Sequence, residues 1–433
     1  MAGEIKVFVE GGAGDVGRSF LKSPAYSGQQ NLFNNIFNIT AIVRNPVKDR
    51  FRLANDHFYN NIFSSVSHAE ENGVNIVYLN GIRVEVRSQE ILNQPLADGG
   101  IGIYVDSTEE SDVGELEKYL EFPAVTRVFK TQALKGKPGT KDASEFPHVI
   151  AHVNHDILTG NERLISMASC TTNAVSTFLF TLLPFIKRLE TSMLSGIHGT
   201  TAMDKATEIV ESFTPKATGA ATALGLVFGN ALPGIDHLIA EVKRGNFTVP
   251  SFADWSCVFE GNNSYTRNDL LGAILKLALS PDYAMMLGLY SIKYDPHPST
   301  RKLAHEGRTI SLRIDDTSFV LDPIRSSSNL YYLRATDIIY DNVYGFANQG
   351  WDTIIAWVNA MSVLPYRLPW IKRVMTSVPM NYDQMLEMLD ELDPRAAAGI
   401  MSKNDYLDMF RWLDDASAED SFLPEERLVS RRG

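Results

Sequence analysis

Cysteine is almost absent from this chain: two of its 433 residues are cysteines, Cys170 and Cys257. Two thiols cannot form a disulfide framework or a sulfur-rich metal cluster, and so low a count is typical of proteins that fold in a reducing compartment. We therefore expect no metal site, and a cytoplasmic location with an organelle matrix as the alternative.

Positive charge and long apolar runs are lacking as well. Lys and Arg number 40 against 52 Asp and Glu, and the resulting net charge of −12 excludes a broad basic footprint for nucleic acid. No apolar run is long enough to span a bilayer, and the opening segment MAGEIKVFVEGG has neither the basic nor the apolar region of a secretory signal. We expect a protein that is neither exported nor inserted in a membrane.

Apolar residues are plentiful enough for more than one core. They make up 44% of the chain, and at this length they can fill two sizeable domains and leave a further segment over. We expect one domain over 1–168, a second over 169–344 and an extension over 363–433. A helix over 345–362 would return to complete the first domain.

The first domain opens on a pattern of strand, glycine turn and helix. The apolar run Ile5–Val9 leads into Gly12-x-Gly14-x-x-Gly17, and further strand-like runs follow at 39–43 and 101–105. Alternation of this kind predicts a parallel, doubly wound sheet. A lone glycine pattern can be a purely structural turn, but between a strand and a helix it favours a phosphate-binding site. The residues expected to form that site are Gly12, Gly14, Asp15, Val16 and Gly17.

The second domain has a different pattern of apolar residues. An apolar helix is expected from Cys170 through Ile186, and the runs 309–313 and 317–321 alternate in hydrophobicity as half-buried strands do. We expect an α+β domain built on a mixed or antiparallel sheet.

The end of the chain is acidic. Between Asp383 and Glu426 there are thirteen acidic and three basic residues, which account for −10 of the net charge. Apolar residues at helical spacing around 385–392 and 406–413 predict two short amphipathic helices. We favour an acidic appendage that packs on its own body, and a partner-binding arm is the alternative.

Cys170 carries the strongest chemical indication. It stands in Ala168-Ser169-Cys170-Thr171-Thr172-Asn173, immediately before the apolar helix. The free N–H groups and dipole of a helix N-terminus stabilise a thiolate, and polar neighbours are unusual for a structural cysteine. His198, at the end of a short strand after this helix, is the natural base for such a thiol, although a core histidine is the alternative.

These pieces together resemble the phosphorylating glyceraldehyde-3-phosphate dehydrogenase family over roughly residues 5 to 362. The landmarks occur in the family's order: the Gly12 turn, Asp106-Ser107-Thr108, Val153-Asn154-His155, the SCTTN run at 169–173, His198, Ala217-Thr218-Gly219-Ala220-Ala221, and 340–348 (YDNVYGFAN). The resemblance implies a Rossmann NAD(P)-binding domain, a catalytic domain, a homotetramer and a place in glycolysis.

The resemblance also implies residue roles. Cys170 would attack an aldehyde while His198 accepts the proton, and inorganic phosphate would cleave the resulting thioester. Asn342 would hold the nicotinamide carboxamide, beside Thr108 and Thr131. The attacking phosphate would meet Ser169, Thr171, Thr218 and Gly219.

The chain departs from the family at both ends of the expected site. The pocket for the substrate's own phosphate maps to Thr201, Met203 and Thr248, and only Thr201 matches the family. The segment between His198 and Thr218 is shorter than the family's loop, and Glu109 replaces a glycine near the nicotinamide path.

The cofactor end departs too, because Arg44 stands where the family has an aspartate. An arginine there suits the 2′-phosphate of NADP, and the alternative is a solvated loop residue. The main interpretation is an NAD(P)-dependent phosphorylating aldehyde dehydrogenase. A weak or inactive homologue serving as a structural or regulatory subunit, and a dehydrogenase for a different aldehyde, are the alternatives.

Overall fold

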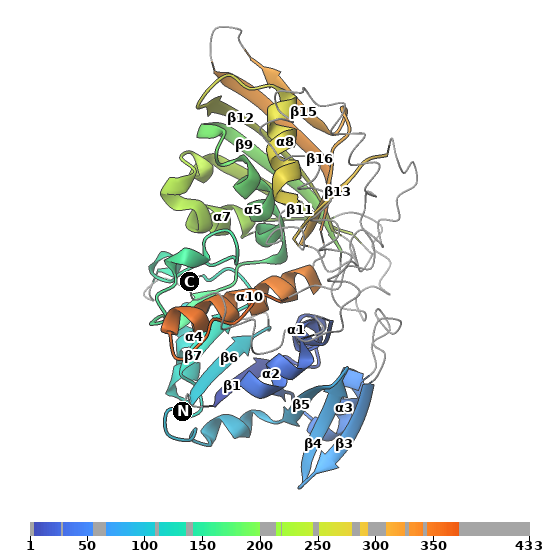
Figure 1. Ribbon diagram of the computed structural model, residues 1–433, viewed down its shortest axis with the longest axis vertical. Helices are drawn as coiled ribbons and strands as arrows, with labels where there is room; N and C mark the ends of the chain where they lie inside the picture. Colours follow the sequence, from blue (N-terminus) through green and yellow to red (C-terminus); the bar gives the residue numbers. More distant parts are fainter. Residues whose placement is uncertain are drawn as a thin grey trace.

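The structure, a computed structural model, describes residues 4–26, 29–54, 66–108, 112–135, 142–199, 214–217, 219–245, 251–278, 286–292, 309–324, 329–340 and 344–371. Within these ranges the chain forms two β-sheets, each with its own helices (Figure 1). The mixed α/β class predicted from the sequence is confirmed.

The N-terminal sheet has eight strands. They run over Ile5–Glu10 (β1), Phe37–Ile42 (β2), Val66–Glu71 (β3), Val74–Leu79 (β4), Ile82–Arg87 (β5), Ile101–Asp106 (β6), Arg127–Lys130 (β7) and Leu164–Ser166 (β8). The helices that accompany them are Asp15–Tyr26 (α1), Gln30–Ile36 (α2), Pro46–Ala54 (α3), Val113–Glu117 (α4) and the distant Tyr344–Met361 (α10).

The strand order is β3-β4-β5-β2-β1-β6-β7-β8, and all neighbours from β5 to β8 are parallel. Strands β3 and β4 add an antiparallel edge. The chain therefore leaves β1 in one direction to build β2 and β5, and in the other to build β6, β7 and β8. In open parallel sheets the crevice at such a reversal, outside the carboxyl ends of the strands, is where ligands bind.

Both faces of this sheet are covered because side chains alternate along each strand. Val7 and Val9 enter one core with residues of α1 and α10, whereas Phe8 enters the core on the other face with Tyr104. Trp351 of α10 stacks on Phe20 of α1 with ring centroids 4.9 Å apart. A helix more than 300 residues along the chain thus covers the first domain's sheet (Figure 1).

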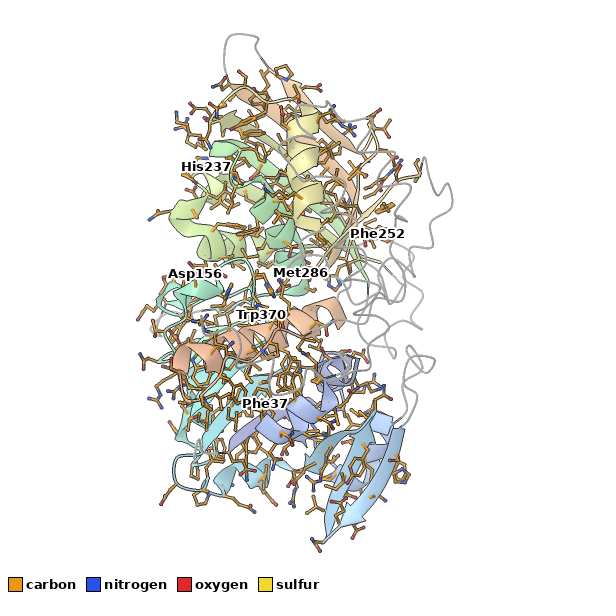
Figure 2. The ribbon with its side chains drawn as sticks, in the orientation of Figure 1. Phe37, Asp156, His237, Phe252, Met286 and Trp370 are labelled. Atoms are coloured by element: carbon orange, nitrogen blue, oxygen red, sulfur yellow. The ribbon has the colours of Figure 1, made fainter. Side chains whose placement is uncertain are left out.

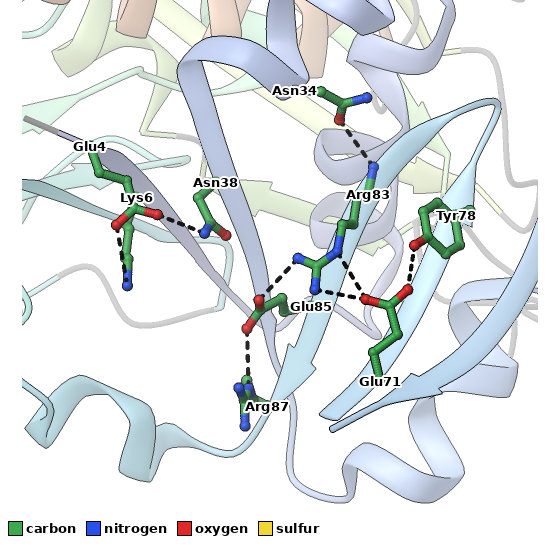
Figure 3. Close-up of polar contacts among 9 residues, drawn as sticks. All are labelled: Glu4, Lys6, Asn34, Asn38, Glu71, Tyr78, Arg83, Glu85 and Arg87. Carbon is green, nitrogen blue, oxygen red and sulfur yellow. Dashed lines mark hydrogen bonds and ion pairs between the residues drawn. The ribbon is translucent and has the colours of Figure 1, made fainter. Parts of the chain in front are cut away.

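Polar contacts hold the antiparallel edge of the sheet (Figure 3). Arg83 of β5 forms ion pairs with Glu71 of β3 at 3.2 Å and with Glu85 at 3.0 Å. The Tyr78 hydroxyl donates to Glu71 at 2.5 Å, and the Arg83 amide donates to Asn34 of α2 at 3.2 Å. These contacts are partly exposed, so each contributes little to the stability of the fold.

The second sheet is longer and mixed. Its strands are Ile186–Gly199 (β9), Thr214–Ala217 (β10), Leu238–Gly245 (β11), Ser251–Gly261 (β12), Leu287–Tyr290 (β13), Ile310–Arg313 (β14), Phe319–Pro323 (β15) and Leu330–Tyr340 (β16). Its helices are Cys170–Leu182 (α5), Ala220–Phe228 (α7) and Arg267–Ala278 (α8). The order is β10-β11-β9-β12-β16-β14-β13, with β15 on β16. The pairs β9–β11 and β13–β14 are parallel and the others antiparallel, so of the two expectations the mixed sheet is the one confirmed.

Three predicted boundaries or lengths in this domain are wrong. Helix α5 ends at Leu182 rather than at Ile186, because Pro184 has no N–H to continue the helical bonds. His198 lies near the end of a strand of 14 residues rather than a short one. The strand expected at 317–321 begins at Phe319, since a turn over 315–318 precedes it.

The segment after α10 returns to the first core. Leu368 and Ile371 are buried there, and Trp370 lies against His152 with ring centroids 4.4 Å apart beside α10 (Figure 2). The predicted acidic helices lie in 372–433, outside the described residues. No helix among the described residues is long and apolar enough to cross a membrane.

Candidate active site

The glycine turn lies between β1 and α1, at the carboxyl edge of the N-terminal sheet. A side chain at Gly17 would place its Cβ 2.3 Å from the Gly11 carbonyl oxygen and 2.8 Å from the Ser107 hydroxyl oxygen. Gly11 has a φ of +67°, a conformation that favours glycine. Sequence reasoning missed Gly11, because the pattern G-x-G-x-x-G begins one residue later.

Helix α1 begins at Asp15 with its amino end at this turn, and its first backbone bond runs from the Arg18 amide to the Gly14 carbonyl at 2.8 Å. The amides of a first helical turn have no partner within the helix, so they are available to an anion. Asp15 forms an ion pair with Arg18, and Val16 is half-buried. The predicted residues therefore lie together in the glycine turn and the first turn of α1: Gly12, Gly14, Asp15, Val16 and Gly17.

Arg44 follows β2, the strand next to β1, and its side chain is exposed. Among the described residues its guanidinium forms no hydrogen bond or ion pair. Its charge lies close enough to Glu10, the last residue of β1, to affect that carboxyl. Burial raises the pKa of Glu10, whereas a hydrogen bond from Tyr104 and the Arg44 charge oppose the rise.

The turn after β6 lies directly beside the glycine turn. The Ser107 hydroxyl donates to the Glu10 carbonyl, which ties the end of β6 to the end of β1. The amide and hydroxyl of Thr108 both donate to Asp106 Oδ1 at 2.7 Å. Thr131, after β7, donates its hydroxyl to the Asp106 carbonyl at 3.1 Å. Thr108 and Thr131, from neighbouring turns, are thus both bonded to Asp106, and both hydroxyls already donate within the protein.

Cys170 is the first residue of α5, as the sequence predicts. Ser169 caps the helix, and its hydroxyl accepts from the Thr172 amide at 3.2 Å. Ala168 has a φ of +55°, a conformation that L side chains rarely adopt, and it is fully buried. This turn is held by the Asn173 amide, which donates to the Met167 carbonyl at 3.0 Å and to the Ser169 carbonyl at 2.9 Å.

His198, on β9 of the second sheet, contacts Cys170. Its Nε2 lies 3.1 Å from Cys170 Sγ, and both side chains are partly exposed. Burial acts to raise the pKa of the Cys170 thiol, but the His198 charge, its hydrogen bond and the Thr171 amide outweigh this, so the pKa is below its ordinary value. The pair is therefore suited to hold a thiolate beside an imidazolium.

Cys257 has the opposite environment. It lies in β12 in the core of the second domain, and burial raises its pKa to about 12. Such a thiol stays protonated and inert at neutral pH.

Tyr340, the last residue of β16, begins the landmark 340–348, but its place beside Cys170 was not predicted. Its hydroxyl lies 3.0 Å from Thr171 Oγ1, and its ring lies 6.4 Å from that of His198. Burial, followed by the charge of Cys170, raises the pKa of Tyr340, so its phenol stays neutral. The contact spans 169 residues, which no local pattern encodes.

Gly219 approaches this site from α7. It is the exposed N-cap of that helix, and a Cβ built on it would lie 3.9 Å from the Ala133 side chain in the loop after β7. Ala133 and Cys170 pack on the same core. Ser169 and Thr171 thus flank the nucleophile in the chain, and Gly219 caps a helix that packs against α5.

Several predicted site residues cannot be placed. Thr201, Met203, Thr218, Thr248, Asn342 and Glu109 lie outside the described residues. Of the Val153-Asn154-His155 landmark, Asn154 is structural: its amide donates to the carbonyls of His148 and Val227 at 2.8 and 3.1 Å. No group of three acidic, histidine or cysteine side chains among the described residues could hold a metal ion.

Comparison with curated proteins finds glyceraldehyde-3-phosphate dehydrogenases. The chain is similar to glyceraldehyde-3-phosphate dehydrogenases from Cereibacter sphaeroides (26% identical, 48% of this chain and 60% of the relative), Bacillus cereus (25%, 78% and 94%) and Streptococcus pyogenes (30%, 38% and 50%). It thus spans less than two thirds of the Cereibacter and Streptococcus proteins. No protein-family model matches the chain.

Proposed function

We propose that this chain, a divergent member of the glyceraldehyde-3-phosphate dehydrogenase family, oxidises an aldehyde with NAD or NADP through a thioester on Cys170. The observation that carries the proposal is the 3.1 Å contact between Cys170 Sγ and His198 Nε2 at the start of α5. The relatives' names point to the same chemistry.

The chain's own residues supply the covalent steps. The Cys170 thiolate adds to the aldehyde carbon, and the imidazolium of His198 protonates the new alkoxide to give a hemithioacetal. His198 then takes the hydroxyl proton back while the carbon is oxidised to the thioester. An oxygen of inorganic phosphate attacks the thioester carbon, and the product leaves as an acyl phosphate while the Cys170 thiolate is restored.

The glycine turn and the first turn of α1, residues 11–17, are called the phosphate cradle below. This cradle fits a dinucleotide, because Gly17 leaves no room for a side chain and the amino end of α1 faces the ligand edge of the sheet. Gly12, Gly14, Asp15, Val16 and Gly17 would hold the pyrophosphate, Arg44 the adenosine end, and Thr108, Thr131 and Asn342 the nicotinamide end. When bound, the nicotinamide ring supplies the acceptor for the hydride. Arg44 favours NADP, because an exposed guanidinium just after β2, with no ion pair among the described residues, suits a 2′-phosphate.

The residues expected to bind the attacking inorganic phosphate support a phosphorylating reaction. Ser169 and Thr171 flank Cys170 at the start of α5, and Thr218 and Gly219 precede α7, which packs against α5. The pocket for the substrate's own phosphate would retain Thr201 without an arginine. The preferred substrate is therefore an aldehyde that does not depend on a strongly held terminal phosphate.

The proposal extends to the organisation of the protein. Residues 1–168 with the helix 345–362 form the dinucleotide-binding domain, 169–344 the catalytic domain, and 363–433 an acidic extension packed on the body. We propose a soluble, cytoplasmic homo-oligomer whose partners are an aldehyde and inorganic phosphate.

Cofactor reduction with a panel of aldehydes tests the proposal. Each aldehyde is offered with NAD and with NADP, in the presence and absence of inorganic phosphate, to the unmodified protein and to Cys170→Ser. Phosphate-dependent reduction by the unmodified protein supports the proposal. Cofactor reduction at the same rate with and without phosphate indicates a different kind of aldehyde dehydrogenase. If no cofactor is reduced although iodoacetamide still labels Cys170, the chain is an inactive homologue.

A further inference from the structure

Four polar residues form one row across the ligand edge of the N-terminal sheet. Glu10, Asp106, Lys130 and Ser166 end the parallel strands β1, β6, β7 and β8, and they are paired in register from strand to strand. Paired residues of neighbouring strands project to the same face. The row therefore runs beneath the turns that carry the cofactor and nucleophile residues.

Lys130 is the unusual member of this row. Its side chain is fully buried, and its ammonium lies 3.2 Å from Asp106 Oδ1. The Asp106 carboxylate is buried as well. Removing a lysine and an aspartate from water is costly, and an apolar pair of similar size is often at least as stable. Fold stability alone thus does not account for a lysine at the end of β7.

The contacts of Lys130 converge on the turn after β6. Its ammonium donates to the Thr108 carbonyl at 2.7 Å, where the Gln132 amide also donates at 3.1 Å. The same ammonium holds Asp106, whose Oδ1 accepts from the amide and hydroxyl of Thr108. Lys130 thus fixes Thr108 directly through its carbonyl and indirectly through Asp106.

The turn fixed in this way is part of the proposed cofactor site. Ser107, within it, bonds to the Glu10 carbonyl and lies against Gly11 and Gly17 of the phosphate cradle. A shift of the 106–108 turn would therefore move one wall of the cradle.

We propose that Lys130 is a positioning residue for the dinucleotide: its buried ammonium holds the 106–108 turn in the conformation that receives the cofactor. This inference rests on the proposed function, since it presupposes that NAD or NADP binds between β1 and β6. Lys130 acts through Asp106 and Thr108.

The test separates stability from cofactor binding with three variants. Lys130→Met removes the ammonium and leaves the Asp106 carboxylate buried without it. The double variant Lys130→Met/Asp106→Asn removes both charges but keeps the oxygen that accepts from Thr108. Lys243→Met, which removes an exposed lysine on β11, is the matched control. For each protein we would measure Tm, the Kd values of NAD and NADP by fluorescence titration, and the rate of Cys170 alkylation.

Lys130→Met is expected to lower Tm and to weaken cofactor binding by about tenfold or more, whereas the double variant should recover most of the Tm but not the affinity. Cys170 alkylation should stay unchanged in all three. If the double variant binds cofactor as the unmodified protein does, Lys130 contributes only to stability and the inference is overturned. If the unmodified protein binds neither cofactor, the proposed function fails and the inference fails with it.

Discussion

Cys170 Sγ and His198 Nε2 lie 3.1 Å apart although 28 residues separate them in the chain. The first begins a helix and the second lies near the end of the strand that follows it, so the helix and the return strand bring the two together. The helix N-terminus stabilises the Cys170 thiolate, and the His198 imidazole can accept the proton of the Cys170 thiol and return it. Chemical reactivity is therefore expected at Cys170 and not at Cys257.

Replacing each cysteine by serine tests this assignment. Cys170→Ser should reduce turnover by about 10³-fold or more, because an enzyme without its nucleophile retains only its binding groups. Cys257→Ser should retain most of the turnover, since that thiol is buried and protonated. Initial rates and stoichiometric iodoacetamide labelling provide the two measurements. Labelling that falls on Cys257 and spares Cys170 would reverse the assignment.

His198→Asn should make Cys170 a slower nucleophile at neutral pH. The variant keeps the burial that raises the thiol pKa but loses the histidine charge and hydrogen bond that lower it, so the pKa rises. The alkylation rate follows the thiolate fraction, so at pH 7 it should fall, by roughly tenfold for each unit by which the new pKa exceeds 7.

The pH profile gives the sharper comparison. In the unmodified protein the midpoint of alkylation should lie below the ordinary thiol value, and in His198→Asn it should move upward. An unchanged midpoint would mean that His198 does not set the ionisation of Cys170.

Gly17→Ala should weaken both folding and cofactor binding, because its Cβ would lie 2.3 Å from the Gly11 carbonyl oxygen. Overpacking of this kind costs about 1–3 kcal/mol of unfolding free energy. Gly225→Ala is the matched control, since a Cβ there meets nothing within 4 Å and Gly225 lies inside α7. That change should raise stability by about 0.5–1 kcal/mol. Urea unfolding and cofactor titration of both variants decide the matter, and equal behaviour of the two would exclude a tight cradle.

Arg44→Asp should shift cofactor preference from NADP toward NAD. The exposed guanidinium suits a 2′-phosphate, whereas an aspartate accepts from the free 2′-hydroxyl and repels a phosphate. Titration of both cofactors should show NADP binding at least as well as NAD before the change and less well after it. Lys276→Asp, an exposed lysine on α8 with the same change of charge, should leave both Kd values unchanged. Tighter NAD binding in the unmodified protein, unaltered by Arg44→Asp, would make Arg44 a bystander.

Thr248→Arg should improve the affinity for glyceraldehyde 3-phosphate. A charged hydrogen bond to phosphate is worth about 1.5–3 kcal/mol, or roughly ten- to a hundred-fold in Kd. Adding Met203→Thr should improve it further. KM values for the unmodified protein and both variants test this. A low micromolar KM in the unmodified protein would show that another basic residue already supplies the charge.

Local patterns predicted the parts of the site that lie within one segment. The glycine turn, the helix that begins at Cys170 and the strands β1, β2 and β6 each follow from a run of residues and its period. Proline at 184 could have been read as the end of α5, and it marks where the boundary prediction went wrong.

Long-range contacts were beyond such patterns. Lys130 reads as an ordinary strand residue until the strand order places it beside Asp106, which precedes it by 24 residues. Tyr340, at the end of β16, meets Thr171, in the first turn of α5, across 169 residues of chain. Positive φ at Ala168 was equally unpredictable, since alanine carries no preference for that conformation.

Trapping the acyl group on Cys170 tests the central claim most directly. The protein is mixed with NAD or NADP and the aldehyde that it oxidises fastest, without inorganic phosphate, quenched in acid and digested for mass spectrometry. The account predicts that the peptide containing Cys170 gains the mass of the aldehyde less two hydrogens, one lost from the aldehyde and one from the thiol. It also predicts that added phosphate removes this mass and that Cys170→Ser never acquires it. Cofactor reduction that proceeds while the Cys170 peptide stays unmodified would contradict a thioester mechanism.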